Sequence, residues 1–331
     1  MMGGLARGPF GLGCAQLGNL YGAISDEAAA TTVDAAWDAG VRYFDTAPHY
    51  GLGLSERRLG AALAVRPRSE YVVSTKVGRM LDRNLLFDGS QRDDEGFDVP
   101  ADRIRRWDFS EEGIRASIEA SLDRLGLEKI DLVLIHDPEQ NLADPGQGLR
   151  EAVPVLERMR SEGSIQAFGV GTRSTRTLET FVRESSIDFI MLAGRYTLLD
   201  HEAVDSLLPA CIDHDVSVLN VGIFNSGLLA RPRPAADAHY EYQPVSDDLR
   251  ARVNDIANVC DEFETSVPRA ALAFAVSHPA IAITVLGASS ARQVRASAEV
   301  LVQPAPIRDF WVRLVECGLL EASVFSEMVF D

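Results

Sequence analysis

Eight short apolar runs, separated by longer amphipathic segments, constrain the fold of this 331-residue chain more than any other feature. Most of the runs are rich in valine, isoleucine and leucine and do not alternate with polar residues. A run of that kind is typical of a strand that a parallel sheet buries on both faces. The eight predicted strands cover residues 10–14, 41–44, 71–74, 130–135, 165–170, 189–192, 216–221 and 281–286.

The segments between the runs have the pattern of helices. Ser25 and Ser110 can cap two of them and are followed by acidic residues, and Gly40 and Gly126 stand where the same two helices end. Eight strands that alternate with helices predict the α/β class and a closed (β/α)8 TIM barrel, a single domain over residues 1–331. The predicted helices cover residues 26–39, 55–64, 110–125, 149–162, 174–184, 200–213, 248–264 and 290–301.

A doubly wound sheet is the alternative arrangement of such elements. It would normally carry a GxGxxG turn after a strand. The glycines Gly11 and Gly13 of the first run are not followed by a third at the required spacing. We therefore interpret them as a tight entry to the first barrel strand.

Three further segments lie outside this alternation. Residues 79–108 and 225–247 are long connections after predicted strands, so both are expected as long loops at the C-terminal face of the barrel. A loop of such length in a compact domain is usually functional or mobile. The tail, residues 307–331, is expected to cover the barrel or to fold back over the site.

Composition excludes several classes of function. A net charge of −17 disfavours nucleic acid and anionic membranes as partners. The chain has no apolar stretch of about 18 residues and no signal-peptide pattern. The histidines and cysteines show no metal-binding spacing, so no metal is expected. Four cysteines without a CxxC pair favour reduced thiols and a cytoplasmic location.

Four residues of complementary chemistry stand at or just after three predicted strands: Asp45, Tyr50, Lys76 and His136. The C-terminal ends of barrel strands meet at one face, where active sites lie. A free phenol has a pKa near 10, and the ammonium of Lys76 would favour phenolate at Tyr50. Asp45 would neutralise the buried lysine, and a neutral His136 would orient the substrate oxygen. Taken singly, each residue is better explained as turn chemistry, a strand cap or an ion pair; together they predict proton transfer between a carbonyl and an alcohol.

With these positions in place, the chain resembles the aldo-keto reductases from about residue 10 to residue 301. The resemblance is carried by several motifs in the family's order. Two of them, residues 193–200 and 222–229, resemble more narrowly the branch of aldose 1-dehydrogenases, with pyridoxal 4-dehydrogenases close by. The motifs are Phe44-Asp45-Thr46-Ala47, Tyr50-Gly51, Ser55-Glu56-Arg57-Arg58-Leu59-Gly60, Ser74-Thr75-Lys76, Leu122-Asp123-Arg124-Leu125-Gly126 and Leu134-Ile135-His136.

The resemblance implies a nicotinamide cofactor and gives Asp45, Tyr50, Lys76 and His136 the roles described above. NADP-specific members usually carry Lys and Arg after the last strand, where this chain has Gly287 and Gln293, so NAD is predicted over NADP. The expected cofactor-binding residues are Tyr196, Gly222, Phe224, Asn225, Ser226, Gly227, Leu228, Gly287, Ala288, Ser289 and Gln293.

The branch implies oxidation of the anomeric C1 hydroxyl of a free aldose, such as L-fucose or D-arabinose, to a lactone. Tyr21, His49 and Trp107 are the expected contributors to the substrate pocket, with Tyr240 a further candidate. Oxidation of pyridoxal, a hemiacetal of another kind, stays open as the near alternative. A non-catalytic nicotinamide-binding subunit is the remote one.

Overall fold

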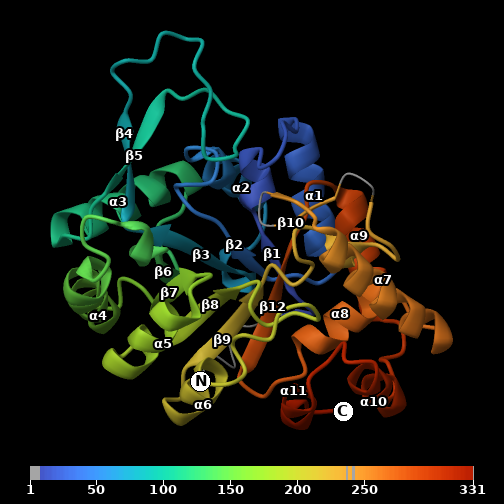
Figure 1. The fold of residues 1–331 in the computed structure, drawn as a ribbon. Helices are drawn as coiled ribbons and strands as arrows, with labels where there is room; N and C mark the ends of the chain where they lie inside the picture. Colours follow the sequence, from blue (N-terminus) through green and yellow to red (C-terminus); the bar gives the residue numbers. More distant parts are fainter. Residues whose placement is uncertain (1–7, 236–237, 241–242, 331) are drawn as a thin grey trace.

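The computed structural model of the protein describes residues 8–235, 238–240 and 243–330, and its centre is a closed barrel of eight parallel strands (Figure 1). Around the barrel the strands follow the order β1-β12-β9-β8-β7-β6-β3-β2. Each observed strand overlaps one of the eight predicted runs, which confirms the (β/α)8 barrel. The strands are β1 (Gly11–Gly13), β2 (Tyr43–Asp45), β3 (Val72–Val77), β6 (Leu132–His136), β7 (Ala167–Thr172), β8 (Phe189–Ala193), β9 (Ser217–Val221) and β12 (Ile281–Gly287).

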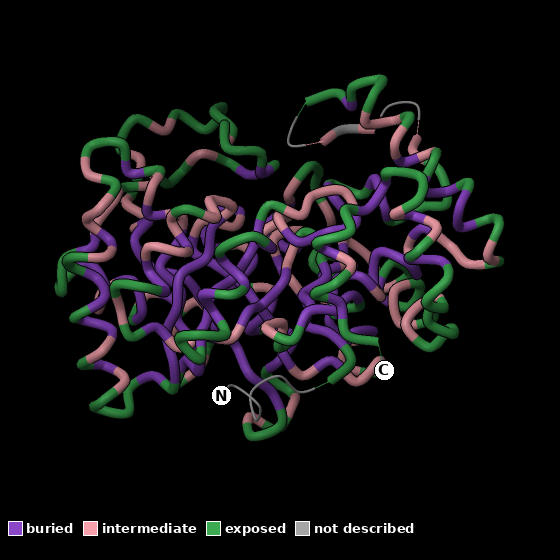
Figure 2. Tube along the Cα trace, turned by 60° about the horizontal axis from the view of Figure 1, so that its bottom comes forward, coloured by how far each residue is buried: buried purple, intermediate pink, exposed green. Residues whose placement is uncertain are grey.

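Alternate residues of these strands point to opposite sides of the barrel wall, because successive side chains of a strand face opposite ways. One set packs together in a small cluster that includes Tyr43, Leu134 and Phe189. The other set, with Phe44 and Val133 among them, joins the larger core beneath the helices. Figure 2 shows this buried layer running through the middle of the molecule. The barrel is therefore a packed core, and only the strand ends are free to carry chemistry.

Helices cover the outside of the barrel. Ser25 and Ser110 cap their helices as predicted, since each hydroxyl accepts a backbone N–H at 3.1 Å. The helices are α1 (Asp26–Asp38), α2 (Leu54–Leu63), α3 (Glu111–Leu125), α4 (Val153–Ser161), α5 (Thr175–Glu184), α6 (Leu207–Asp213), α7 (Asp247–Glu262), α8 (Val267–Ala275), α9 (Ala291–Leu301), α10 (Arg308–Glu316) and α11 (Ala322–Glu327).

The predicted helix over residues 200–213 is wrong in its first half. Only α6, from residue 207, is helical, and residues 201–205 form turns or irregular chain. Pro209 explains the late start, because a proline inside a helix removes a hydrogen bond and clashes with the carbonyl four residues earlier, here that of Asp205. The sequence analysis also missed α8, although Ser266 caps it and a proline stands in its first turn.

The C-terminal tail packs on the outside of the barrel (Figure 1). There α10 lies against α7, and α11 lies beside α10. Trp311 is fully buried and its ring centroid lies 6.2 Å from that of Phe274 in α8. The backbone N–H of Val329 donates to the carbonyl of Ser277 just beyond α8. Of the two positions expected for the tail, the described residues occupy the one that covers the barrel.

Residues 79–108 do not form a plain loop. They contain an antiparallel hairpin, β4 (Arg79–Arg83) paired with β5 (Arg103–Trp107), whose connecting segment projects from the body in Figure 1. Arginines of β5 pair with carboxylates across the hairpin, as Arg106 does with Asp82 at 2.6 Å. The second long connection carries the short strands β10 (His239–Tyr240) and β11 (Gln243–Pro244). Within the described parts of the chain, every helix is too short or too polar to span a bilayer.

Candidate active site

The four residues expected to act together meet at the C-terminal ends of β2, β3 and β6. Asp45, Lys76 and His136 have the same parity along their strands as the residues that fill the barrel interior, so their side chains point inward. Tyr50 follows in the turn between β2 and α2. Residues 91 positions apart in sequence, Asp45 and His136, are thereby brought to one site.

Asp45 and Lys76 form a buried ion pair at the floor of this site. The ammonium Nζ lies 2.8 Å from Oδ1 and 2.7 Å from Oδ2 of the carboxylate, and it also donates to the carbonyl of Thr46 at 3.0 Å. The hydroxyl of Ser74 donates to Asp45 Oδ1 at 2.7 Å. Burial acts to lower the pKa of Lys76, but the Asp45 carboxylate and the neighbouring Tyr50 raise it above its ordinary value. The lysine therefore keeps its charge.

Tyr50 lies next to this charge. The Lys76 Nζ is 4.6 Å from the centroid of the tyrosine ring. Burial raises the pKa of the Tyr50 phenol to about 12, while the charge of Lys76 acts in the opposite direction. A phenol beside a fixed ammonium can exchange a proton with a bound hydroxyl, because the ammonium stabilises the phenolate that forms.

His136 completes the group from β6. Its ring centroid is 5.8 Å from that of Tyr50, in an edge-to-face arrangement. Burial, with the charges of Arg79 and Lys76, lowers the pKa of His136 well below its ordinary value. The ring is therefore neutral and can hydrogen-bond a substrate oxygen without adding charge to the site.

The β4–β5 hairpin contributes residues that the sequence analysis missed. Phe97, from the segment between its strands, packs edge-to-face on His49 at 5.2 Å and lies 6.0 Å from the Tyr50 ring. Arg79 is buried and donates to Asp137, next to His136, at 2.7 Å. The signal was weak, because an arginine in a charged segment is usually solvated and only the folded hairpin turns it inward.

The three residues predicted to line the substrate pocket occupy different surroundings. His49 joins the site, with its ring 5.4 Å from that of His136. Trp107 stacks on Phe109 at 5.8 Å and lies under the guanidinium of Arg79. Tyr21 is 64% exposed and has a left-handed backbone with φ 63°. Tyr240, in β10, is partly buried.

The segments expected to bind the cofactor follow β9 and β12. Residues 225–227 all have left-handed backbone conformations, which bends the chain sharply after β9. The amide oxygen of Asn225 is buried and has no hydrogen-bond partner among the described residues, so an acceptor is available there. After β12, Gln293 accepts from the backbone N–H and the hydroxyl of Ser289, at 2.7 and 3.1 Å. Gly287 is exposed, and the loop that follows it leads into the N-terminus of α9, the kind of position at which backbone N–H groups can bind a phosphate.

Tyr196 does not belong with these residues. Its ring is 1% exposed and packs at 4.7 Å from the ring of Phe274 in α8, and its hydroxyl bonds that of Ser277 at 2.9 Å. It therefore lies in the layer between the barrel and the helices, where it cannot stack on a cofactor. The expectation for Tyr196 was wrong because a tyrosine three residues past a strand can point either into the barrel mouth or outward to the helices. Here it points outward, because its ring packs on the apolar surface of α8.

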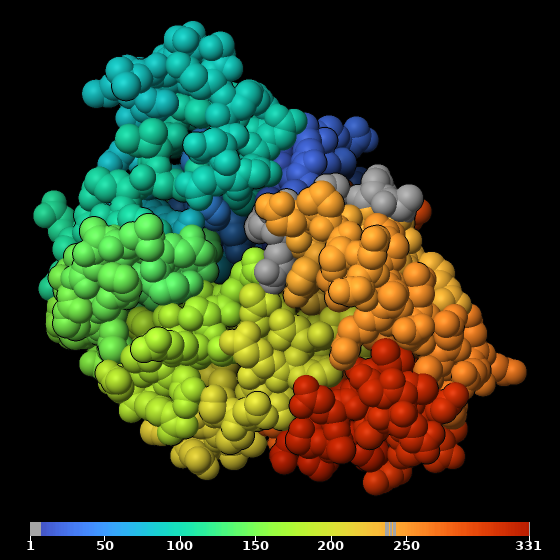
Figure 3. Space-filling view, in the orientation of Figure 1, coloured from blue at the N-terminus to red at the C-terminus, as the bar shows by residue number. Residues whose placement is uncertain are grey.

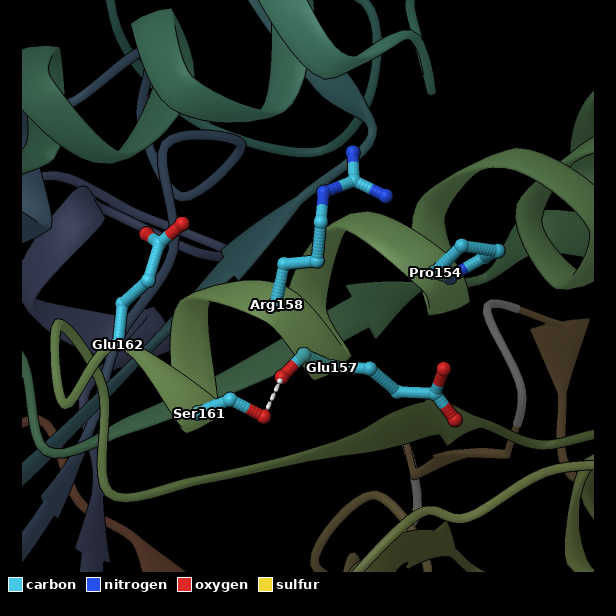
Figure 4. A pocket seen from close by; sticks show the side chains of 5 residues that line it. All are labelled: Pro154, Glu157, Arg158, Ser161 and Glu162. Carbon is cyan, nitrogen blue, oxygen red and sulfur yellow. Dashed lines mark hydrogen bonds between the residues drawn. The ribbon is translucent and has the colours of Figure 1, made fainter.

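The recess above the strand ends is visible in the space-filling view. Blue residues of the N-terminal part are seen at its floor, between the teal hairpin and the orange segment that follows β9 (Figure 3). A separate hollow lies on the outer face of α4, lined by Pro154, Glu157, Arg158, Ser161 and Glu162 (Figure 4). It contains none of the residues discussed above. No cluster of metal-ligating side chains is present in the described ranges.

Comparison with known proteins gives a consistent picture. The model of the Aldo/keto reductase family matches residues 9–311. The chain is 45% identical to the D-threo-aldose 1-dehydrogenase of a Pseudomonas species and 32% identical to the pyridoxal 4-dehydrogenase of Microbacterium luteolum, with 96% of both proteins covered in each case. The solved aldo-keto reductase AKR11C1 of Bacillus halodurans, in its holo form, matches with a TM-score of 0.71 at 26% identity, over 96% of this chain and 95% of that one.

Proposed function

The chain belongs to the aldo/keto reductase family, and we infer its reaction from that membership and from the geometry of the site. Four side chains converge at one face of the barrel: Asp45, Tyr50, Lys76 and His136. The protein is an oxidoreductase that acts on a CH–OH group. Its substrate is a free aldose, whose anomeric C1 hydroxyl it oxidises to the lactone. The 45% identity to a D-threo-aldose 1-dehydrogenase over 96% of the chain is the observation that carries the substrate class.

The four side chains divide the work of that oxidation. Tyr50 takes the proton from the C1 hydroxyl as general base, and the ammonium of Lys76 favours the phenolate that this step requires. Asp45 holds the ammonium in place through two contacts below 3 Å. His136, neutral, hydrogen-bonds the C1 oxygen and fixes its direction toward Tyr50. A bound nicotinamide cofactor supplies the hydride acceptor.

The residues proposed to hold that cofactor are those after β9 and β12: Gly222, Phe224, Asn225, Ser226, Gly227, Leu228, Gly287, Ala288, Ser289 and Gln293. Two observations support this proposal: the buried amide oxygen of Asn225 has no hydrogen-bond partner among the residues that the structure describes, and Ser289 lies in the loop that leads into α9.

NAD is the proposed cofactor, in preference to NADP. Gly287 and Gln293 stand where a 2′-phosphate would need cationic side chains, and Gln293 is folded onto Ser289. Arg292 and Arg295 are exposed on α9. Kinetic titration with both cofactors tests this, and a clear preference for NADP would refute it. A cytoplasmic location is proposed alongside.

Pyridoxal is the second candidate substrate. The chain is 32% identical to a pyridoxal 4-dehydrogenase along its whole length. The same four residues would serve, because a cyclic hemiacetal is oxidised to a lactone in both reactions.

Formation of NADH, followed at 340 nm with L-fucose, D-arabinose, L-galactose, D-glucose and pyridoxal, distinguishes the two. Activity confined to sugars of one configuration supports the aldose assignment, whereas activity with pyridoxal alone overturns it. Tyr50→Phe is expected to lower kcat by about 10²–10⁴-fold with cofactor binding retained. A non-catalytic nicotinamide-binding subunit would be indifferent to that change.

A further inference from the structure

His49 stands beside the four reacting residues but is held from outside the barrel. The guanidinium of Arg105, in β5, donates from Nε to His49 Nδ1 at 2.7 Å and from Nη2 to the His49 carbonyl at 3.1 Å. Arg105 is itself fixed by the buried carboxylate of Asp93, with Nη2 to Oδ2 at 3.2 Å. Both side chains of that pair are nearly buried, at 10% and 3% exposure. The hairpin thus clamps one edge of the imidazole.

The clamp determines the state of the ring. An arginine can only donate, so Nδ1 of His49 must be an acceptor and the proton of the neutral ring must sit on Nε2. Burial, with the charges of Arg79 and Arg105, lowers the pKa of His49 to about 2. The ring therefore stays neutral at any working pH. In the described part of the chain Nε2 has no hydrogen-bond partner, which leaves one N–H to donate.

That N–H belongs to a ring placed close to the reacting groups. The centroid of His49 is 5.4 Å from that of His136 and 6.0 Å from that of Tyr50. The three rings lie within 6.0 Å of one another, and Phe97 packs against two of them, His49 and Tyr50. The His49 side chain is 13% exposed, so it is not sealed from a ligand. An oxygen bound between Tyr50 and His136 would have its neighbouring groups within reach of His49.

We propose that His49 is a specificity-determining residue, whose Nε2–H donates to the hydroxyl on the sugar carbon adjacent to C1, and that Arg105 is the positioning residue that fixes its tautomer. The inference rests on the proposed aldose 1-dehydrogenase function. An aldose differs from a simple hemiacetal in carrying that hydroxyl. A site built to hydrogen-bond a substrate group rejects an analogue that lacks it, because the buried donor is then left unpaired.

The test compares, for each protein, kcat/KM with the aldose that the wild type oxidises fastest and with its 2-deoxy analogue. We expect the wild type to prefer the parent sugar at least tenfold. His49→Phe keeps a ring of similar size without the N–H and should bring this ratio near one. His49→Gln keeps an amide donor and should restore part of it.

Arg105→Gln should reduce the same ratio several-fold, mainly through KM for the parent sugar. Its matched control is Arg106→Gln, on the same strand, whose guanidinium pairs with Asp82 and Asp108 at the surface. That control should leave the ratio unchanged. A loss of hairpin structure alone would lower both activities together without changing their ratio.

The outcomes separate this inference from the proposed function. If no aldose is oxidised by the wild type, the proposed function fails and the inference fails with it. If aldoses are oxidised but the wild type ignores the 2-hydroxyl, or His49→Phe keeps the full preference, only the inference is overturned. Nitrogen-15 NMR of the wild-type protein with NADH and the sugar gives a second readout. Protonated Nε2 that shifts on sugar addition supports the proposal, and protonated Nδ1 refutes it.

Discussion

Replacing Asp45 by asparagine should destabilise the protein far more than the loss of an ordinary ion pair. Lys76 and Asp45 are 2.7 Å apart and only 2% and 5% exposed. At that distance the attraction between unit charges is about 6 kcal/mol for an effective dielectric constant of ~20, and it offsets the desolvation of both groups. Asparagine keeps the shape but leaves the ammonium buried without a counter-charge. We expect a loss of about 3–5 kcal/mol in the free energy of unfolding.

Equilibrium urea unfolding at pH 7 measures this loss, and the chain offers a matched control. Glu262→Gln removes the carboxylate that lies 3.1 Å from Arg313, where both side chains are more than 40% exposed. That change should cost at most about 1 kcal/mol. The double variant Asp45→Asn with Lys76→Met should be more stable than Asp45→Asn alone, because no charge remains buried.

The pH dependence gives a further check on the same pair. Because the pKa of Lys76 is raised above its unfolded value, its contribution is fully present below about pH 10.4 and is lost as pH rises through the folded-state pKa. The stability gap between wild type and Asp45→Asn should therefore be constant from pH 7 to about 10 and narrow above that. A cost below 1 kcal/mol, or a double variant no better than the single one, would show that the pair is not the buried unit described here.

Two other predictions follow from single contacts. Burial raises the pKa of Tyr50 to about 12, and the proposed oxidation needs the deprotonated phenol. The logarithm of kcat/KM for the sugar should therefore rise steadily between pH 7 and 10. A plateau at neutral pH would contradict this. Gly60→Ala in α2 should destabilise the protein by several kcal/mol in thermal unfolding, although alanine is normally the better helix former, because the new Cβ would lie 2.2 Å from the carbonyl oxygen of Leu125. Gly22→Ala, where no atom lies within 4 Å, is its control and should be close to neutral.

Local signals in the sequence were enough to predict the barrel and the convergence of the four candidate catalytic residues. Buried parallel strands are recognisable from their composition, and a residue at a strand's C-terminal end can only lie at one face of a closed barrel. That is why Lys76 and Asp45 could be placed together from sequence. Side-chain conformations are not needed for this inference, because the parallel topology alone brings all the strand C-termini to one face.

Contacts that depend on which way a side chain turns could not be predicted in the same way. Tyr196 was expected at the cofactor and instead packs on Phe274, whose helix α8 the sequence analysis had not recognised. The hairpin over residues 79–108 was expected only as a long loop. The pairing of β4 with β5 brings Arg105 into contact with His49, 56 residues away in sequence. Hydrophobic periodicity in the sequence does not predict such a contact.

The candidate catalytic residues and the residues around His49 come from two different parts of the fold, the barrel strands and the β4–β5 hairpin. Asp45, Lys76 and His136 stand on strands whose positions the closed barrel fixes. His49 accepts a hydrogen bond from Arg105 of the hairpin, which lies outside the barrel, and Arg105 is held in turn by its ion pair with Asp93. On the proposal that His49 selects the sugar, substitutions in β4 and β5 should alter which hydroxyl pattern is accepted, while Tyr50 and Lys76 remain in place. The same proposal predicts that variants of the hairpin residues change substrate preference more than they change the rate of the chemical step.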